Sequence, residues 1–328
     1  MKAVFNKARR KKFRQPKRGR GGRGGEFRLA RASKFAVRIF VKKSSDFNQK
    51  APPNKFFMSN YCYLNGKILP LDKASVDLND IGILRGYGVF EFMRTYNGKP
   101  FLLDKHFARF MNSAKTLNLK VPVGEKEIEK IIRQLLIKNK LPEAGIKLVL
   151  TGGRTDDGVN YSPDRPTFFV LISRLSEFHH DLYRKGAKLI TLEYQREFPL
   201  AKTTNYLAAV SLQETKKKKG AIDILYTNKG FISECARSSF FIFKNNELVT
   251  TKDSILKGIT RGLVIKLATG KFKVTERPIK VSELKFADEA FITSTDKEIM
   301  PIVKIDGTKI GNDRVGDNTI WLMKAFIR

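Results

Sequence analysis

Short apolar strands joined by tight turns of two or three residues are the feature that most constrains what this chain can fold into. Such turns occur at Asn65-Gly66, at Asn97-Gly98 after a strand predicted over 89–96, and at Asn228-Lys229-Gly230 within a hairpin predicted over 222–233. Asn-Gly pairs favour the positive φ angles of hairpin turns. They therefore predict antiparallel pairing between strands that are neighbours in the sequence.

Helical patterns alternate with these strands. A helix is predicted from about Asp104, its N-cap, with the apolar positions Phe107, Phe110, Met111, Ala114 and Leu117 at helical spacing. Further helices are predicted over 125–140, 206–218 and 259–269, and after Asp317; further strands are predicted over 146–151, 166–173, 187–194 and 289–294. Gly270 is the expected C-cap of the third of these helices. The fold class is α+β with mixed sheets.

The positive charge is concentrated at the start of the chain. The 328 residues have a net charge of +32, and residues 1–57 contain 19 Lys and Arg residues against two acids, Glu26 and Asp46. This Gly-interrupted segment cannot bury enough apolar surface to offset backbone ordering, so we predict a disordered basic extension. The remainder predicts a small α/β domain over 58–175, a linker over 176–185 and a larger domain over 186–328.

Three interpretations fit the basic extension. Arg-Gly runs follow phosphate backbones, so residues 1–57 would act as an RNA-binding arm, and a nucleic-acid-binding protein is the rival functional class. The scarcity of acids also fits a transit peptide. The preferred interpretation is an upstream extension without a folded role, because the patterned region opens at Met58.

Composition argues against several classes of protein. The two cysteines, Cys62 and Cys235, give no disulfide framework and fit a reducing cytoplasm. No apolar run approaches the roughly 18 residues of a membrane span. With three histidines, of which His179 and His180 are adjacent, we expect no metal site.

The segment from Gly230 to Arg261 carries the first indication of chemistry. Glu234 ends an alternating strand, and a Gly-Ile-Thr turn at 258–260 opens a helix. The free N–H groups and the dipole of such an opening favour an anion. Upstream, Lys202 stands alone among small and polar residues. Each feature is weak by itself, but a carboxylate, an anion-binding turn and an isolated lysine together suggest a phosphorylated cofactor.

The order of these pieces resembles the fold-type IV, pyridoxal-phosphate-dependent aminotransferases, which include D-amino-acid aminotransferase, branched-chain aminotransferase and aminodeoxychorismate lyase. The resemblance spans about 60–307. It rests on Asn65-Gly66, Asp80, the string Gly86-Tyr-Gly-Val-Phe-Glu, the string from His106 to Ala114, Lys202-Thr-Thr-Asn, Glu234, Leu256-Lys-Gly-Ile-Thr-Arg, and the segment from Asp288 to Thr295. It implies a two-domain fold with a small α/β N-terminal domain and a larger pseudo-barrel α/β C-terminal domain.

The resemblance also implies roles for individual residues. Lys202 matches the Schiff-base lysine and Glu234 the acid at the pyridine nitrogen of pyridoxal 5'-phosphate. The residues matched to cofactor binding, mostly to its phosphate, are Arg109, Leu256, Ile259, Thr260 and Thr295. The chain departs from the family pattern at Ser239, where asparagine is usual, and in a shorter segment between Thr251 and Leu256.

Substrate recognition is less sharply indicated. The candidates are Arg85, Phe90, Arg94, Arg154 and the turn amides at Thr295 and Asp296. Resemblance to the family implies a homodimer that moves an amino group between an amino acid and a 2-oxo acid. The Leu84–Glu91 string and the Lys202-Thr-Thr-Asn spacing favour the D-amino-acid branch over the branched-chain one. Aminodeoxychorismate lyase, which catalyses elimination with the same cofactor, is the alternative within the family.

Overall fold

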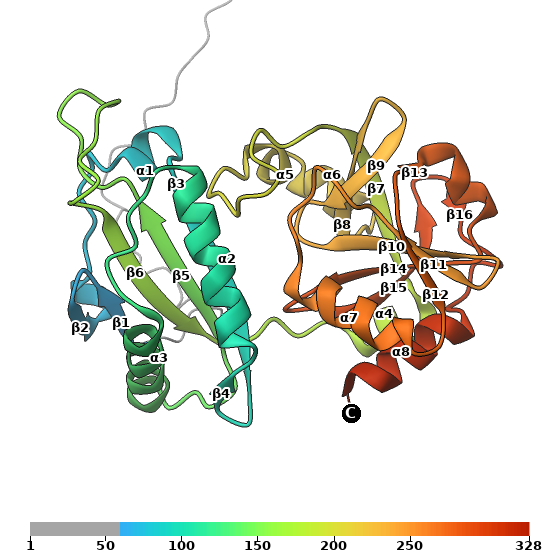
Figure 1. Ribbon diagram of the computed structural model, residues 1–328, viewed down its shortest axis with the longest axis horizontal. Helices are drawn as coiled ribbons and strands as arrows, with labels where there is room; N and C mark the ends of the chain where they lie inside the picture. The colour runs from blue at the N-terminus through green and yellow to red at the C-terminus, as the bar shows by residue number, and fades with distance from the viewer. Residues whose placement is uncertain (1–59, 328) are drawn as a thin grey trace, which may run out of the picture. The chain divides into compact units, whose positions relative to one another are not determined.

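The computed structural model describes residues 60–327, so the predicted basic extension over 1–57 lies outside the described residues. The described chain forms two sheets (Figure 1). The first has six strands in the spatial order β2 (Lys67–Pro70), β1 (Tyr61–Leu64), β6 (Thr167–Ser173), β5 (Gly145–Thr151), β3 (Gly88–Tyr96) and β4 (Lys99–Pro100). All its neighbouring strands are antiparallel, as the turn sequences predict.

Two long helices pack against the first sheet. Helix α2 (Leu103–Thr116) contributes Phe107, Phe110 and Ala114 to the core, and α3 (Glu125–Asn139) contributes four isoleucine and leucine side chains that are at most 2% exposed. The sheet supplies the residues Ile146, Leu148 and Leu150 from alternate positions of β5. The opposite face of β5 is therefore free to line a site. The short helices α1 (Ile81–Arg85) and η1 (Leu71–Lys73) complete this part of the chain.

The second sheet has ten strands and is mixed. Its spatial order is β12 (Lys273–Glu276), β11 (Glu247–Thr250), β10 (Ser239–Lys244), β14 (Glu289–Ser294), β15 (Glu298–Ile305), β7 (Ala187–Glu193), β8 (Asp223–Asn228), β9 (Phe231–Cys235) and β13 (Ile279–Lys280), with β16 (Thr308–Lys309) on β15. The pairs β11–β12, β7–β15 and β7–β8 are parallel. Helices α7 (Ile259–Thr269) and α8 (Asp317–Ile327) cover one aromatic-rich face. This is the α+β, half-barrel architecture that the family resemblance implies.

The hairpin turns adopt the backbone conformation that their sequences predict. The φ angles are 44° at Asn65 and 92° at Gly66, and 52° at Asn97 and 73° at Gly98. The third hairpin differs by one residue, because Asn228 is the last residue of β8 and the turn is Lys229-Gly230. A positive φ is cheapest for glycine, which explains why glycine stands second in each turn.

Two of the predicted helices are wrong in detail. Helix α2 begins one residue early, at Leu103, so Asp104 lies in its first turn and is not the N-cap; Met111 is 42% exposed and not a core residue. The helix predicted over 206–218 is two short helices, α5 (Leu207–Ser211) and α6 (Gln213–Lys218), because Leu212 leaves the helical conformation. The segment over 176–185 contains the short helix α4 (His180–Lys185), and its role as a linker stays a prediction.

Gly270 caps α7 without a left-handed conformation, since its φ is −73°. The 3₁₀ helix η2 (Val281–Phe286) leads into β14. No helix within residues 60–327 is long and apolar enough to cross a membrane.

Stacked phenylalanines at the centre of the second sheet give a test of this core. Phe241 and Phe291 lie on the paired strands β10 and β14, are 0% exposed, and stack with ring centroids 4.7 Å apart. Phe241→Ala is expected to lower the free energy of unfolding by about 3–5 kcal/mol, because a large cavity replaces the ring. Phe286→Ala, which removes a ring that is 61% exposed, should change it by less than about 0.5 kcal/mol. Equal losses in urea unfolding would contradict the assigned core.

Candidate active site

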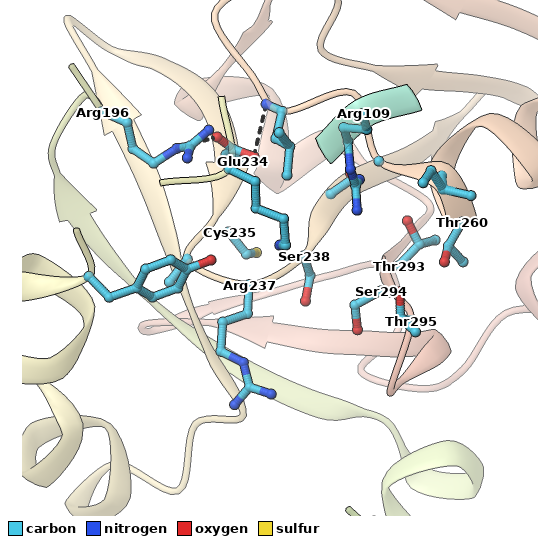
Figure 2. A pocket seen from close by; sticks show the side chains of 17 residues that line it. Arg109, Arg196, Glu234, Cys235, Arg237, Ser238, Thr260, Thr293, Ser294 and Thr295 are labelled. Carbon is cyan, nitrogen blue, oxygen red and sulfur yellow. Dashed lines mark hydrogen bonds and ion pairs between the residues drawn. The ribbon is translucent and has the colours of Figure 1, made fainter. Parts of the chain in front are cut away.

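One pocket brings together the lysine, the acid and the anion-binding turn predicted from sequence (Figure 2). It is lined by 17 residues, which include Arg109, Lys202, Glu234, Leu256, Ile259, Thr260 and Thr295. All the residues predicted to bind the cofactor thus line the same pocket as the predicted catalytic lysine. Their roles stay predictions, but the spatial requirement that those roles impose is met.

Lys202 is held in place by the first sheet. The Phe90 N–H of β3 donates to the Lys202 carbonyl at 2.9 Å, and the Lys202 N–H donates to Ser113 Oγ of α2 at 3.0 Å. Its Nζ lies 4.5 Å from the centroid of the Phe90 ring. Burial lowers the pKa of the Lys202 amine to about 8, and the nearby Arg109 acts in the same direction. A substantial fraction of the amine is therefore neutral near pH 8.

Glu234 is buried at the end region of β9 and has two partners. Arg196 Nε donates to Glu234 Oε1 at 2.9 Å, and the Leu256 N–H donates to Oε2 at 3.2 Å. Burial raises the pKa of Glu234, although Arg196 opposes the rise. Arg196 also donates to the carbonyls of Ala201 and Pro199, so it links the acid to the Lys202 segment. Leu256 contributes its backbone amide to the site.

Arg109 is positioned by a buried carboxylate. Glu91 on β3 is 0% exposed and accepts from Arg109 Nε at 2.9 Å and Nη2 at 2.5 Å, while His106 Nδ1 lies 3.0 Å from the same carboxylate. Burial alone would raise the pKa of Glu91, but Arg109 and His106 lower it below its ordinary value. Arg109 Nη1 donates to the Lys257 carbonyl at 3.2 Å, which brings the guanidinium beside the opening of α7.

The opening of α7 approaches this guanidinium with free backbone donors. Gly258 is the N-cap, and the first-turn amides that follow at Ile259 and Thr260 have no acceptor within the helix. A Cβ on Gly258 would lie 2.7 Å from Ser239 Oγ, so the glycine permits this close approach. Arg109, the α7 opening and the hydroxyl-bearing Thr295 form a set suited to a phosphate group.

A wider cavity adjoins the pocket and shares Lys202 and Thr295 with it. Its volume is about 640 Å³, which is enough for an amino acid. Phe90 and Asp296, two of the predicted substrate-binding residues, line it.

The three predicted substrate-binding arginines line neither the pocket nor this cavity. Arg85 lines a separate cavity. Arg94 pairs with Glu298 at 2.6 Å, and Arg154 lies near the exposed Asp77 and Asp156.

Among the lining residues that were not identified from sequence, three have long polar side chains. Arg196, Tyr206 and Arg237 all line the pocket. Burial raises the pKa of Tyr206 to about 12, so its hydroxyl stays protonated and can donate a hydrogen bond. Arg237 lies three residues after Glu234, and this proximity to the acid is the one sequence signal that could have found it.

The lowered pKa of Lys202 predicts a pH-dependent stability in the cofactor-free protein. Lys202→Met should raise the free energy of unfolding at pH 7 by about 1–3 kcal/mol, because a charged amine no longer occupies a buried position. Between pH 8 and 10.5 the unfolded amine binds a proton that the native amine has lost. Wild-type stability therefore rises with pH in this window, and the gain from the substitution shrinks.

Urea unfolding of both proteins from pH 7 to 10 tests this expectation. Lys266→Met, on the exposed face of α7, is the matched control and should show no such trend. A gain that stays constant above pH 8 would contradict the lowered pKa.

Comparisons with known proteins agree with this geometry. The family model "Amino-transferase class IV" matches residues 88–305. The "Putative branched-chain-amino-acid aminotransferase" of Methanocaldococcus jannaschii is 38% identical over 275 residues, covering 80% of this chain and 94% of that protein. A D-alanine aminotransferase of Staphylococcus epidermidis is 30% identical over 270 residues, covering 80% and 95%.

Solved structures show the same fold. A branched-chain amino acid aminotransferase from T.th. with pyridoxamine 5'-phosphate superposes with a TM-score of 0.78 at 26% identity, covering 83% of this chain and 94% of that one. The Escherichia coli branched-chain enzyme gives 0.75 at 27% identity, with coverage of 82% and 93%. The extent of the family match and the identity to these relatives establish that the chain belongs to the class IV aminotransferases.

Proposed function

We propose that this protein is a pyridoxal 5'-phosphate-dependent transaminase that moves an amino group between an amino acid and a 2-oxo acid. The observation that carries the proposal is the convergence of Lys202, Glu234 and Arg109 with the α7 opening in one pocket. The family membership supports it, and a structural relative is described with pyridoxamine 5'-phosphate.

The chemistry of the lining residues fits the three polar ends of this cofactor. Arg109 and the α7 amides would hold its phosphate, with Thr260 as a further donor; Thr295 would join them by exchanging its 3.3 Å hydrogen bond to the Phe92 carbonyl for one to the phosphate. Glu234, with its orientation fixed by Arg196 and the Leu256 amide, would face the ring nitrogen. Lys202 would hold the aldehyde end covalently. When bound, the cofactor supplies an electron sink for the bond broken at the substrate's Cα.

The chain's own residues then provide proton transfer and orientation. With a pKa of about 8, the Lys202 amine can act as a general base near neutral pH. It can accept a proton from the substrate's Cα and then donate that proton to a neighbouring atom. Tyr206 lines both the pocket and the wider cavity and would act as a hydrogen-bond donor there. The aromatic rings of Phe90 and Tyr206, whose centroids lie 5.6 Å apart, would limit access of water to this proton.

We further propose a cytoplasmic homodimer. The free thiols of Cys62 and Cys235 are both buried and unpaired, which fits a reducing compartment.

Relatives named for D-alanine and for branched-chain amino acids leave two substrate branches. Pyruvate formation from D-alanine, compared with glutamate formation from L-leucine and 2-oxoglutarate, decides between them. Catalytic release of pyruvate in an assay that contains no 2-oxo acid as amino acceptor would instead indicate the lyase.

Lys202→Ala is the first test of the proposal. The purified wild-type protein should be yellow and lose its visible absorption on borohydride treatment. The variant should lack that absorption and lose transamination by at least about 10⁴-fold, because both the covalent link and the base are gone. A colourless wild-type protein that binds RNA with a steep salt dependence would contradict the proposal.

Glu91→Gln tests whether the buried carboxylate positions Arg109 for the phosphate. The variant should bind pyridoxal 5'-phosphate about 10- to 100-fold more weakly, since a charge-assisted pair orients the guanidinium. Glu91→Asp, which keeps the charge, should recover part of the affinity, and Glu129→Gln on the exposed side of α3 should have no effect. A folded Glu91→Gln protein with wild-type affinity would contradict this role.

A further inference from the structure

The wider cavity beside Lys202 is strongly positive. The charged residues that line it are Lys147, Arg174, Lys202 and Arg237, against the single acid Asp296. One wall is apolar and comes from the face of the first sheet opposite its core. There β3, β5 and β6 place Phe90 beside Val149 and Phe169, and Phe92 beside Lys147 and Leu171.

Lys147 is a charged residue among the apolar side chains of this wall. Its cross-strand neighbours are the apolar Phe92 and Leu171, and it is half-buried. No acid within residues 60–327 lies in ion-pair or hydrogen-bond distance of its amine. Burial lowers the pKa of Lys147, and the nearby charge of Arg237 lowers it further. A cation that is partly desolvated without a counter-charge is unfavourable unless an anion joins it.

Arg237 faces the same cavity from the second sheet. It lines both the inner pocket and the cavity, and its side chain extends away from Arg109 and Thr260 (Figure 2). The guanidinium therefore lies away from the proposed phosphate site. Its Nη2 donates to Asp296 Oδ2 at 2.6 Å, yet the side chain is still 53% exposed. Most of its donors remain available to a ligand.

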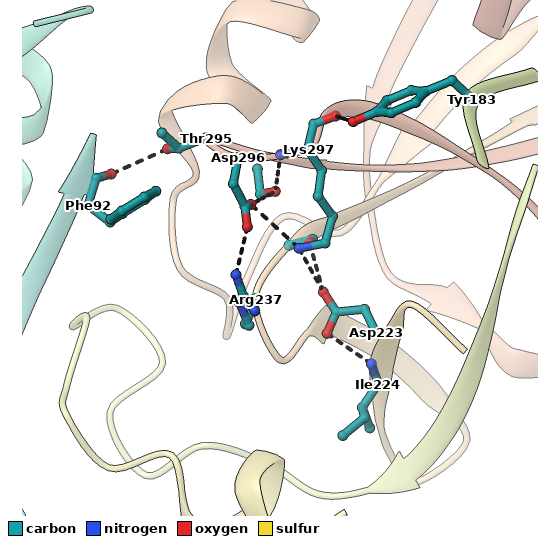
Figure 3. A network of polar contacts seen from close by, with 10 residues as sticks. Phe92, Tyr183, Asp223, Ile224, Arg237, Thr295, Asp296 and Lys297 are labelled. Carbon is teal, nitrogen blue, oxygen red and sulfur yellow. Dashed lines mark hydrogen bonds and ion pairs between the residues drawn. The ribbon is translucent and has the colours of Figure 1, made fainter. Parts of the chain in front are cut away.

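A buried charge network holds Arg237 in this position (Figure 3). Asp296 is 8% exposed, accepts from Ser294 Oγ at 2.6 Å, and lies 3.5 Å from the amine of Lys297. Lys297 is 2% exposed and makes a second ion pair with Asp223 at 3.6 Å. The carboxylates of Asp223 and Asp296 balance the charges of Lys297 and Arg237, but Asp296 uses only part of the guanidinium, so Arg237 keeps further N–H donors for a ligand.

We propose that Lys147 and Arg237 form an anion site that binds a carboxylate of the substrate between the two sheets, with Asp296 as a positioning residue for Arg237. This inference rests on the proposed transaminase function. The apolar wall accommodates the body of the substrate, and the two cations select acids over simple amines. The carboxylate is either the one attached to the reacting carbon or a second, distal one, and both present the same chemistry to the site.

Arg237→Gln and Lys147→Met test the site, since each removes a charge while keeping most of the side-chain length. Arg184→Gln on α4, where the arginine is 72% exposed and pairs with Asp181, is the matched control. Each site variant should raise KM for the carboxylate substrate by about 10- to 100-fold, the range for one charge-assisted contact. The visible absorption and the affinity for pyridoxal 5'-phosphate should stay those of the wild type.

The choice of substrates identifies which carboxylate is bound. Alanine and glutamate are compared in the handedness that the enzyme accepts. Loss of affinity for both assigns the carboxylate on the reacting carbon, and loss for glutamate alone assigns the distal one. Unchanged KM for both in both variants would overturn the proposal.

Direct binding provides a second measurement that does not depend on turnover. Calorimetric titration of the holoenzyme with glutarate, if the distal carboxylate is bound, or with 4-methylvalerate, if the one on the reacting carbon is bound, should show the same 10- to 100-fold weakening in the variants. The corresponding neutral amide should bind wild type and variants alike, and equal weakening for the amide would overturn the anion site. A wild-type protein without cofactor absorption would instead refute the transaminase, whereas an active wild type with unaffected variants refutes only the anion site.

Discussion

The site depends on backbone pairing between β3 and the segment that carries Lys202. The Lys202 carbonyl accepts from Phe90, the Thr204 N–H donates to the Gly88 carbonyl at 2.9 Å, and Val89 bridges Thr203. These bonds attach a segment from the second half of the chain to a strand of the first sheet. They place the lysine at the junction of the two sheets, where residues of both can surround it. Because backbone bonds do not depend on side-chain identity, the reactive amine is held while its own side chain stays free to react.

Strand β3 also carries the carboxylate that fixes the cation of the pocket. Glu91 follows Phe90 directly, so its side chain points to the opposite face of the sheet, towards α2. There it meets Arg109 and His106 at successive positions of one helix face. The alternation of a single strand thus serves both parts of the site: one face supports the lysine, and the other orients the arginine.

Sequence reasoning was sufficient where local rules act and insufficient where partners are distant. Two hairpin turns and the long α2 and α3 patterns follow from residues close in the chain, and the structure confirms them apart from single positions such as Asp104. The motif residues that share one pocket were found because their order resembles a family. The pair of Arg196 with Glu234 was not predicted. The two residues lie 38 positions apart, and no local sequence pattern connects residues at that distance. For the same reason the pair of Arg94 with Glu298, 204 residues away, was not predicted, and the substrate-binding role of Arg94 stays a prediction.

The cations around Lys202 have two effects that oppose each other. Arg109 and Arg196 lower the pKa of the lysine because like charges disfavour its protonated form. The same charges attract anions into the pocket and the adjoining cavity. An anion bound beside Arg109 cancels part of that charge and therefore raises the pKa of Lys202 again. By reciprocity, a neutral Lys202 binds that anion less tightly than a protonated one does. The burial of the lysine resolves the conflict, because desolvation is the larger cause of its lowered pKa and persists when the arginines are neutralised.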